Sequence, residues 1–105
     1  MIIADIKEPW MPIEEAFAAQ AYKELVREVG PKHSLRGKKA EAVARRQDCD
    51  DVLFILEGGG CAVVHLTFQG NEESDPRWPS TEIFSSIEEW RIKRMLPDHE
   101  DFVSL

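Results

Sequence analysis

Two short apolar segments separated by three consecutive glycines constrain the fold of this chain more than any other feature. Residues 52–56 read VLFIL, residues 61–68 read CAVVHLTF, and Gly58, Gly59 and Gly60 lie between them. Runs of this length, rich in β-branched and aromatic residues, are typical of strands, and glycine readily adopts the positive φ angles of a hairpin return. A triple glycine can also cradle phosphate, but no Lys-Ser/Thr pair follows it and no helix begins there. The sequence therefore predicts a β-hairpin.

This hairpin has two faces, because successive side chains of a strand point to opposite sides of the sheet. With Glu57 predicted opposite Cys61, the main core face carries Val52, Phe54, Leu56, Ala62, Val64, Leu66 and Phe68, joined by Ala42 and Ala44. The other face carries Glu41, Val43, Arg45, Leu53, Ile55, Cys61, Val63, His65 and Thr67. This second face is too apolar to remain in water, so another segment of the chain or a second copy must cover it. The chain is accordingly expected to be a monomer or a homodimer.

Helix-forming segments flank the hairpin. Residues 13–29 combine a broad apolar stripe with acidic residues in the first turn and end at Gly30-Pro31, which predicts a helix. Residues 86–95 follow a capping-box pattern and predict a second helix that ends before Pro97. Residues 40–46 are ambiguous between helix and strand. We interpret them as a strand because this segment and the two hairpin strands follow one another at a regular spacing of about ten residues, as in a β-meander. Residues 81–84 alternate polar and apolar side chains and are a candidate fourth strand.

Together these elements predict an α+β fold: an N-terminal helix, a three- to four-stranded antiparallel β-meander and a C-terminal helix. The 105 residues are expected to form a single domain. Within it, residues 1–12 are predicted to be an extended segment, residues 69–80 a long loop, and residues 97–105 a C-terminal tail.

Charge and hydropathy disfavour several classes of function. A net charge of -7 opposes binding to nucleic acid and to anionic membranes, which both reward a basic surface. No apolar run approaches the ~18 residues of a membrane span and no signal-peptide pattern precedes the first helix, so we expect a cytoplasmic protein. Residues 32–46 nevertheless hold six bases and one acid. Such a run usually forms a solvated face, and a binding stripe for an anion or an acidic partner stays open as the alternative.

Catalytic motifs are absent from the sequence: it contains no P-loop, dinucleotide fingerprint, nucleophile elbow or HExxH. Cys49 and Cys61 are expected to be free thiols. Along a strand, Cys61 and His65 lie about 13 Å apart, too far to share a proton. The segment 98–101, DHED, lacks the spacing of a metal site, so neither a metal nor a cofactor is expected. An enzyme is disfavoured, and the candidate catalytic residues are His65 and Arg45.

Trp78 lies between two prolines in a polar loop, at residues 75–79, DPRWP. Large aromatic side chains are mostly buried, so its ring is expected either to cap the second sheet face or to anchor a partner. The candidate partner-binding residues are Glu72, Glu73, Asp75, Arg77 and Trp78.

Four segments carry a resemblance to known proteins: ARR at 44–46, DDVLF at 50–54, VVHLTF at 63–68 and DPRWP at 75–79. In this order they resemble a group of small uncharacterised bacterial proteins, over about residues 33–101. The resemblance implies no reaction. In size and acidity the chain is also similar to immunity proteins that block secreted bacterial toxins.

We therefore expect a non-enzymatic protein-interaction module, immunity- or antitoxin-like, that binds a protein partner through the loop 69–80 and the adjacent acidic C-terminal region. The alternative is a small ligand-binding protein or hydrolase. Its pocket would lie between the Trp78 loop and the sheet face that carries His65 and Arg45.

Overall fold

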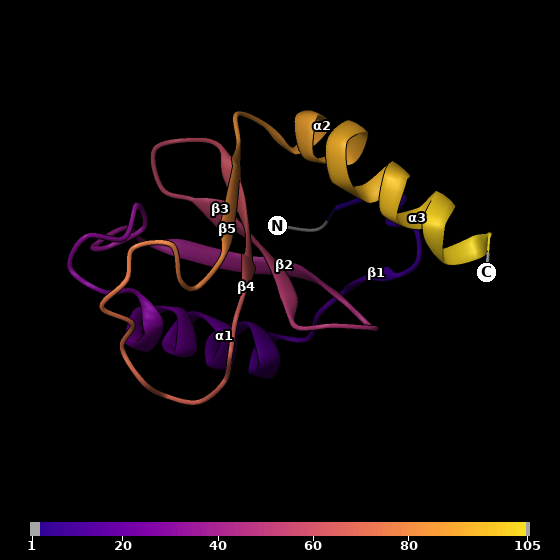
Figure 1. The fold of residues 1–105 in the computed structure, drawn as a ribbon. Helices are drawn as coiled ribbons and strands as arrows, with labels where there is room; N and C mark the ends of the chain where they lie inside the picture. Colours follow the sequence, from indigo (N-terminus) through magenta and orange to yellow (C-terminus); the bar gives the residue numbers. More distant parts are fainter. Residues whose placement is uncertain (1–2, 105) are drawn as a thin grey trace.

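A five-stranded antiparallel sheet lies between two helical layers (Figure 1). The computed structural model describes residues 3–104. The strands lie side by side in chain order: β1 Trp10–Pro12, β2 Ala40–Arg46, β3 Asp51–Leu56, β4 Cys61–His65 and β5 Thr81–Phe84. Helix α1, Glu15–Glu28, packs on one face, and α2 Ile87–Trp90, the π-helical turn η1 Arg91–Met95 and α3 Leu96–Val103 lie on the other.

The α+β class, the N-terminal helix, the antiparallel sheet and the C-terminal helix are confirmed, while the number of strands is five instead of three to four. The additional strand is β1, which pairs antiparallel with β2 through Trp10 and Arg46. Its residues belong to the segment 1–12 that was predicted to be merely extended. A strand that ends in proline suits the edge of a sheet, because Pro12 has no N–H to donate to a further strand.

The predicted hairpin is confirmed, but its register was wrong by two residues. Ile55, not Glu57, lies opposite Cys61, and the N–H of Leu56 donates to the carbonyl of Gly60. The turn therefore takes in Glu57 as well as Gly58 and Gly59, both of which have positive φ. Because a shift of two residues preserves the alternation of side chains, every residue of β3 and β4 still points to its predicted face.

Strand β2 does not keep its predicted faces throughout. Ala42 pairs with Phe54 but Ala44 pairs with Leu53, so a β-bulge lies at Val43. An extra residue in one strand reverses the faces of the residues beyond it. Ala44 therefore packs on the sheet face away from α1. Arg45 turns to the side of α1, where its guanidinium lies 4.5 Å from the ring centre of Phe17.

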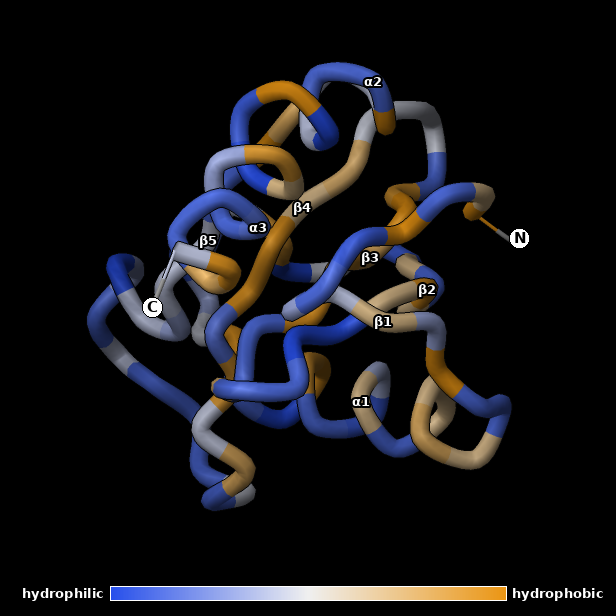
Figure 2. The backbone as a smooth tube through the Cα atoms, turned by 90° about the vertical axis from the view of Figure 1, so that its right-hand side faces the viewer, coloured by the Kyte–Doolittle hydropathy of each residue, from blue (hydrophilic) through white to orange (hydrophobic). Residues whose placement is uncertain are grey.

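One core cluster lies between the sheet and α1, as the alternation of the hairpin predicts. Apolar residues of α1 recur three or four residues apart, and Ala21 and Leu25 are buried against the strands. The sheet contributes Ala42, Val52, Phe54, Leu56, Ala62 and Val64, all buried. Figure 2 shows the hydrophobic tube of β3 and β4 running through the interior between the helical layers.

The second sheet face is covered by the chain itself, from both of its ends. Trp90 and Met95 of the C-terminal helices are buried there together with Trp10. The two indole rings meet edge to face, with 5.3 Å between ring centroids and 84° between planes. Trp78 takes no part in this cluster, so the expectation that its ring caps the second face was wrong.

The C-terminal helical layer continues beyond the predicted boundary at Pro97. Residues 97–103 are helical in α3, so the prediction of a tail at 97–105 was wrong for the residues that the structure describes. In a regular α-helix a proline ring clashes with the carbonyl four residues earlier. Here the wider π-helical turn precedes it, and Leu96 donates its N–H to the carbonyl of Arg91, five residues back.

Among residues 3–104, no helix is long and apolar enough to cross a membrane.

Candidate functional site

Carboxylates of α1 hold the chain segment that leaves β4. Glu28 accepts the backbone N–H of Thr67 at both carboxylate oxygens, 2.9 and 3.0 Å away, and that of Phe68 at 2.9 Å. One turn earlier, Glu24 accepts the N–H of Gly70 at 2.9 Å. Residues 69–80, as predicted, contain neither helix nor strand. These bonds satisfy backbone groups that have no ladder partner and fix where the loop begins.

Glu28 is a buried carboxyl group with no exposed surface. Burial, which disfavours the charged form, raises its pKa to about 7, and the hydrogen-bonded carboxyl of Glu24 acts in the same direction. The backbone N–H groups of Thr67 and Phe68 act against this shift by stabilising the carboxylate. At neutral pH the contact between α1 and the loop therefore titrates.

The middle of the loop packs tightly on the end of α1. Glu73 donates its N–H to the carbonyl of Glu28 at 3.0 Å. A Cβ atom added to Gly30 would lie 2.0 Å from the carbonyl oxygen of Glu73, so a side chain cannot fit there without moving the backbone. Arg36 adds a clamp by donating to the carbonyl of Val29 at 2.9 Å and to the carboxylate of Glu72 at 3.1 Å.

His33 holds the far end of the loop from the segment after α1. Its ring is 5% exposed, and Nδ1 accepts the N–H of Leu35 at 3.0 Å. The proton of the neutral ring therefore lies on Nε2, which donates to the carbonyl of Pro79 at 3.0 Å. Pro79, the residue after Trp78, is itself buried. The Trp78 loop, residues 69–80, is thus attached to the body of the protein at its beginning, middle and end.

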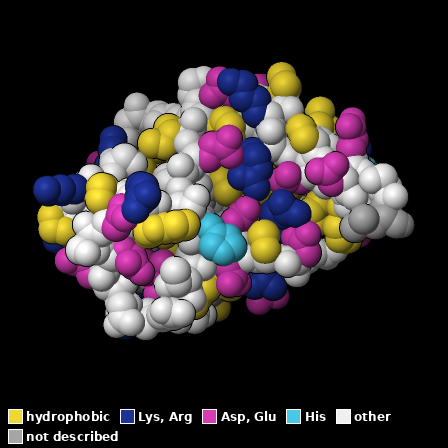
Figure 3. Space-filling model, in the orientation of Figure 1, with side chains coloured by type: hydrophobic (Ala, Val, Ile, Leu, Met, Phe, Trp, Pro, Cys, Tyr) yellow, Lys and Arg dark blue, Asp and Glu magenta, His cyan; other side chains and the backbone are white. Residues whose placement is uncertain are grey.

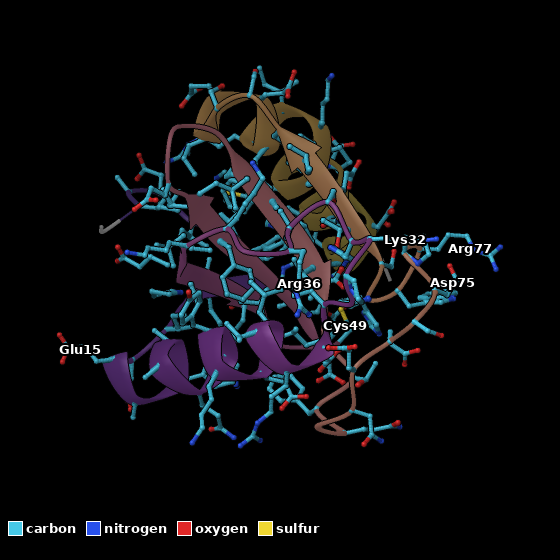
Figure 4. The ribbon with its side chains drawn as sticks, turned by 90° about the vertical axis from the view of Figure 1, so that its left-hand side faces the viewer. Glu15, Lys32, Arg36, Cys49, Asp75 and Arg77 are labelled. Atoms are coloured by element: carbon cyan, nitrogen blue, oxygen red, sulfur yellow. The ribbon has the colours of Figure 1, made fainter. Side chains whose placement is uncertain are left out.

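Trp78 itself is half exposed, with 51% of its surface accessible to solvent. Beside it, Arg77 forms an ion pair with Asp75, 2.6 Å between Nη2 and Oδ2. The Arg77 side chain and backbone both donate to Asp75 and lower the pKa of that carboxyl to about 2. Figure 4 shows Asp75 and Arg77 together where the loop projects away from the sheet. Of the predicted partner-binding residues, Glu72, Arg77 and Trp78 are exposed, while Glu73 and Asp75 are partly buried.

The acidic C-terminal region is not adjacent to this loop, contrary to expectation. In Figure 1 the loop passes beside α1, whereas α2 and α3 lie across the sheet from it. Several of the C-terminal acids have partners within the protein. Asp98 accepts hydrogen bonds from Trp10 and Arg94, and Glu89 caps the N–H of Ser85.

Arg45 and His65, the two candidate catalytic residues, lie on opposite faces of the sheet, so they cannot both line the pocket predicted between one sheet face and the Trp78 loop. Arg45 pairs with Val52 on the α1 side, whereas His65 pairs with Asp51 on the other. A hollow of about 430 Å³ is lined by Arg45 but by neither His65 nor Trp78. The β-bulge at Val43 causes this separation. The sequence has no glycine or proline at this position from which a bulge could be predicted.

His65 lies close to Asp51 and to Cys49, and the thiol was not predicted there. Nδ1 of His65 lies 2.7 Å from Oδ1 of Asp51, and donor atoms of Cys49, Asp51 and His65 all lie within 4.8 Å of one another. Both cysteines are free, as predicted, but the thiol near His65 is Cys49 and not Cys61. Burial raises the pKa of the Cys49 thiol, so at neutral pH it stays protonated and is a poor nucleophile. The DCDD turn at 48–51, placed opposite His65 by the hairpin, was the available signal.

The basic stretch 32–46 does not form one binding stripe. Arg36 is directed to the Trp78 loop, Arg45 to Phe17, and Arg46 to the carboxylates of Asp48 and Asp98. Figure 3 shows basic and acidic side chains interspersed across one face of the molecule. The three arginines of the stretch are thus engaged with separate groups of the protein and do not form a shared anion-binding stripe.

No protein-family model, curated protein or solved structure matches this chain.

Proposed function

We propose that this protein is a non-enzymatic interaction module that binds another protein through the Trp78 loop, with the indole of Trp78 as the apolar anchor. The observation that carries the proposal is the exposure of Trp78, 51% of the residue, on a loop held at three points. The other two tryptophans, Trp10 and Trp90, are fully buried, and burial of a large aromatic side chain is favourable. Trp78 lacks this stabilisation in the free protein. Such exposure is accounted for if a partner buries the ring.

The attachment of the loop supports the same proposal on energetic grounds. A flexible loop loses conformational entropy when it binds, which subtracts from the affinity. Glu28, Gly30 and His33 hold this loop against the body before any partner arrives. Tryptophan is also the residue type that most often dominates the binding energy of an interface. A fixed loop carrying one exposed tryptophan therefore suits a small, specific contact.

The charge of the loop indicates the chemistry of the partner. Three acids, Glu72, Glu73 and Asp75, accompany one base, Arg77, in a chain of net charge -7. Acidic groups around an apolar anchor favour a partner with an apolar pocket and a basic rim, since opposite charge accelerates and orients the encounter. An immunity- or antitoxin-like role is one form of this function, in which the partner is a basic bacterial toxin.

Affinity capture with matched variants tests the proposal. Immobilised wild-type protein, Trp78→Ala and Ile92→Ala are incubated with extract of the producing organism, and bound proteins are quantified by mass spectrometry. Ile92 is the control because it is more exposed than Trp78, at 64%, but lies on the C-terminal helical layer. We expect a basic protein captured equally by the wild type and Ile92→Ala and lost with Trp78→Ala. If no captured protein depends on Trp78, the proposal is wrong.

A further inference from the structure

Three chemically different metal-ligand side chains converge at one end of the sheet. Cys49 offers a sulfur, Asp51 a carboxylate oxygen and His65 a ring nitrogen, and these donor atoms all lie within 4.8 Å of one another. Cys49 and His65 are exposed, while the side chain of Asp51 is 14% exposed. Cys49 and Asp51 also line the hollow of about 430 Å³, so an ion has access to them from solvent.

The sheet and the C-terminal helix hold this cluster in place. Asp51 and His65 are direct cross-strand partners in β3 and β4, and Cys49 lies in the turn that leads into β3. Arg94 donates to the second carboxylate oxygen, Oδ2, of Asp51 at 2.9 Å. That bond leaves Oδ1 directed at His65 and fixes the carboxylate plane, as the outer partners of metal ligands commonly do.

The spacing of the three donors suits a small tetrahedral ion. Bonds of about 2.0–2.3 Å to nitrogen, oxygen and sulfur separate the ligand atoms of such a site by about 3.3–3.5 Å. The 2.7 Å contact between Asp51 and His65 needs to lengthen by about half an ångström, and the thiol of Cys49, within 4.8 Å of both, needs to approach them by up to about 1.3 Å. Cys49 and His65 are exposed and can make both movements while Asp51 stays in place.

We propose that Cys49, Asp51 and His65 bind a divalent transition metal ion of the zinc class, with a fourth position open to water. Sulfur and imidazole ligands select zinc and similar borderline ions over magnesium and calcium, which prefer oxygen. Asp50, next to the cysteine, adds negative charge around the ion, whereas the charge of Asp48 is balanced by Arg46. The site is separate from the Trp78 loop, and neither proposal depends on the other.

Cobalt(II) and zinc(II) binding to the untagged, reduced protein tests this site. Cobalt reports its own ligands, because thiolate coordination gives a charge-transfer absorption and tetrahedral geometry gives intense visible bands. We expect one cobalt ion per chain with both features, and its displacement by one equivalent of zinc. Loss of a direct ligand should weaken binding by more than the roughly 10–100-fold that loss of an outer partner costs.

Three variants decide the outcome. Cys49→Ser and His65→Ala are expected to lose the cobalt spectrum and the zinc affinity, whereas His99→Ala, which removes a histidine of α3, keeps both. Cys49→Ser retains Cys61, so it also controls for binding to any free thiol. Circular dichroism establishes whether each variant is folded. If His65→Ala is unfolded, the result for Cys49→Ser, a substitution in an exposed turn, decides the test. A wild-type protein without thiolate-to-cobalt absorption, or a folded Cys49→Ser variant that keeps it, overturns the proposal.

Discussion

The carboxylate of Glu28, at the end of α1, accepts the backbone N–H of Phe68 at 2.9 Å, from a residue 40 positions further along the chain. The same carboxylate holds Thr67, and Glu24 holds Gly70. Three backbone amides at the start of the loop, two of them just before it, are satisfied by two side chains of one helix. Two side chains of α1 therefore fix where the Trp78 loop begins.

Stability should fall as pH rises, because the pKa of Glu28 is raised to about 7 from its ordinary value of 4.5. Between these two values the folded chain holds a proton at this site that the unfolded chain has released. Stabilisation by this proton is fully present below the ordinary pKa of 4.5 and is lost as the pH rises through the folded pKa of about 7. From pH 5 to pH 8 the Glu28 contribution to the free energy of unfolding should decrease by about 2–3 kcal/mol.

Urea denaturation of Glu28→Gln beside the wild type isolates this contribution, since other groups titrate in both proteins. The amide imitates the protonated carboxyl, so the variant should lack this part of the pH dependence. Glu15→Gln, an exposed acid on the same helix, serves as the control and should follow the wild type. Parallel pH profiles for the wild type and Glu28→Gln would refute the assignment.

Gly30→Ala should displace the loop from α1. The new Cβ would lie 2.0 Å from the carbonyl oxygen of Glu73, and crowding of this kind costs about 1–3 kcal/mol. We also expect faster proteolytic cleavage within residues 69–80. Gly37→Ala is a matched control, because Gly37 has a positive φ but open space around its Cβ position. It should cost stability through its backbone without accelerating cleavage of the loop.

Asp98→Ala should destabilise the C-terminal helical layer. Asp98 accepts the indole N–H of Trp10 at 2.9 Å and a hydrogen bond from Arg94 at 3.2 Å, and it lies 3.4 Å from Arg46. Removing it leaves two largely buried guanidinium groups and one indole N–H without this acceptor, at a cost of about 2–3 kcal/mol. Thermal unfolding measures the loss. Asp101→Ala, at an exposed position of α3, should change stability little, and equal losses in the two variants would contradict this account.

Much of the sheet could be predicted from the sequence because alternation in β3 and β4 survives an error of two residues in register. Phe54 still faces α1 and Leu53 still faces Trp90. Strand β2 was predicted correctly against its helical composition. The bulge at Val43 could not be predicted, because the two strands differ there by one residue that no local sequence signal marks.

The candidate site depended on such details. Arg45 left its predicted face because of the bulge, and Cys49 reached His65 because the true register places Asp51 opposite His65. Strand β1 went unrecognised because three residues ending in Pro12 show too little alternation. The helix beyond Pro97 depends on a π-helical turn, which hydrophobic spacing does not reveal. The exposure of Trp78 follows from Trp10 and Trp90 covering the face that its ring was expected to cap.

The affinity of the captured partner for wild-type, Trp78→Ala and Ile92→Ala protein tests the proposed function most directly. Titration calorimetry with purified components measures it. An anchor tryptophan contributes about 2 kcal/mol or more, so Trp78→Ala should weaken binding by about thirtyfold or more while Ile92→Ala leaves it unchanged. Equal affinity of the wild type and a folded Trp78→Ala variant would show that this ring is not the anchor and would contradict the account.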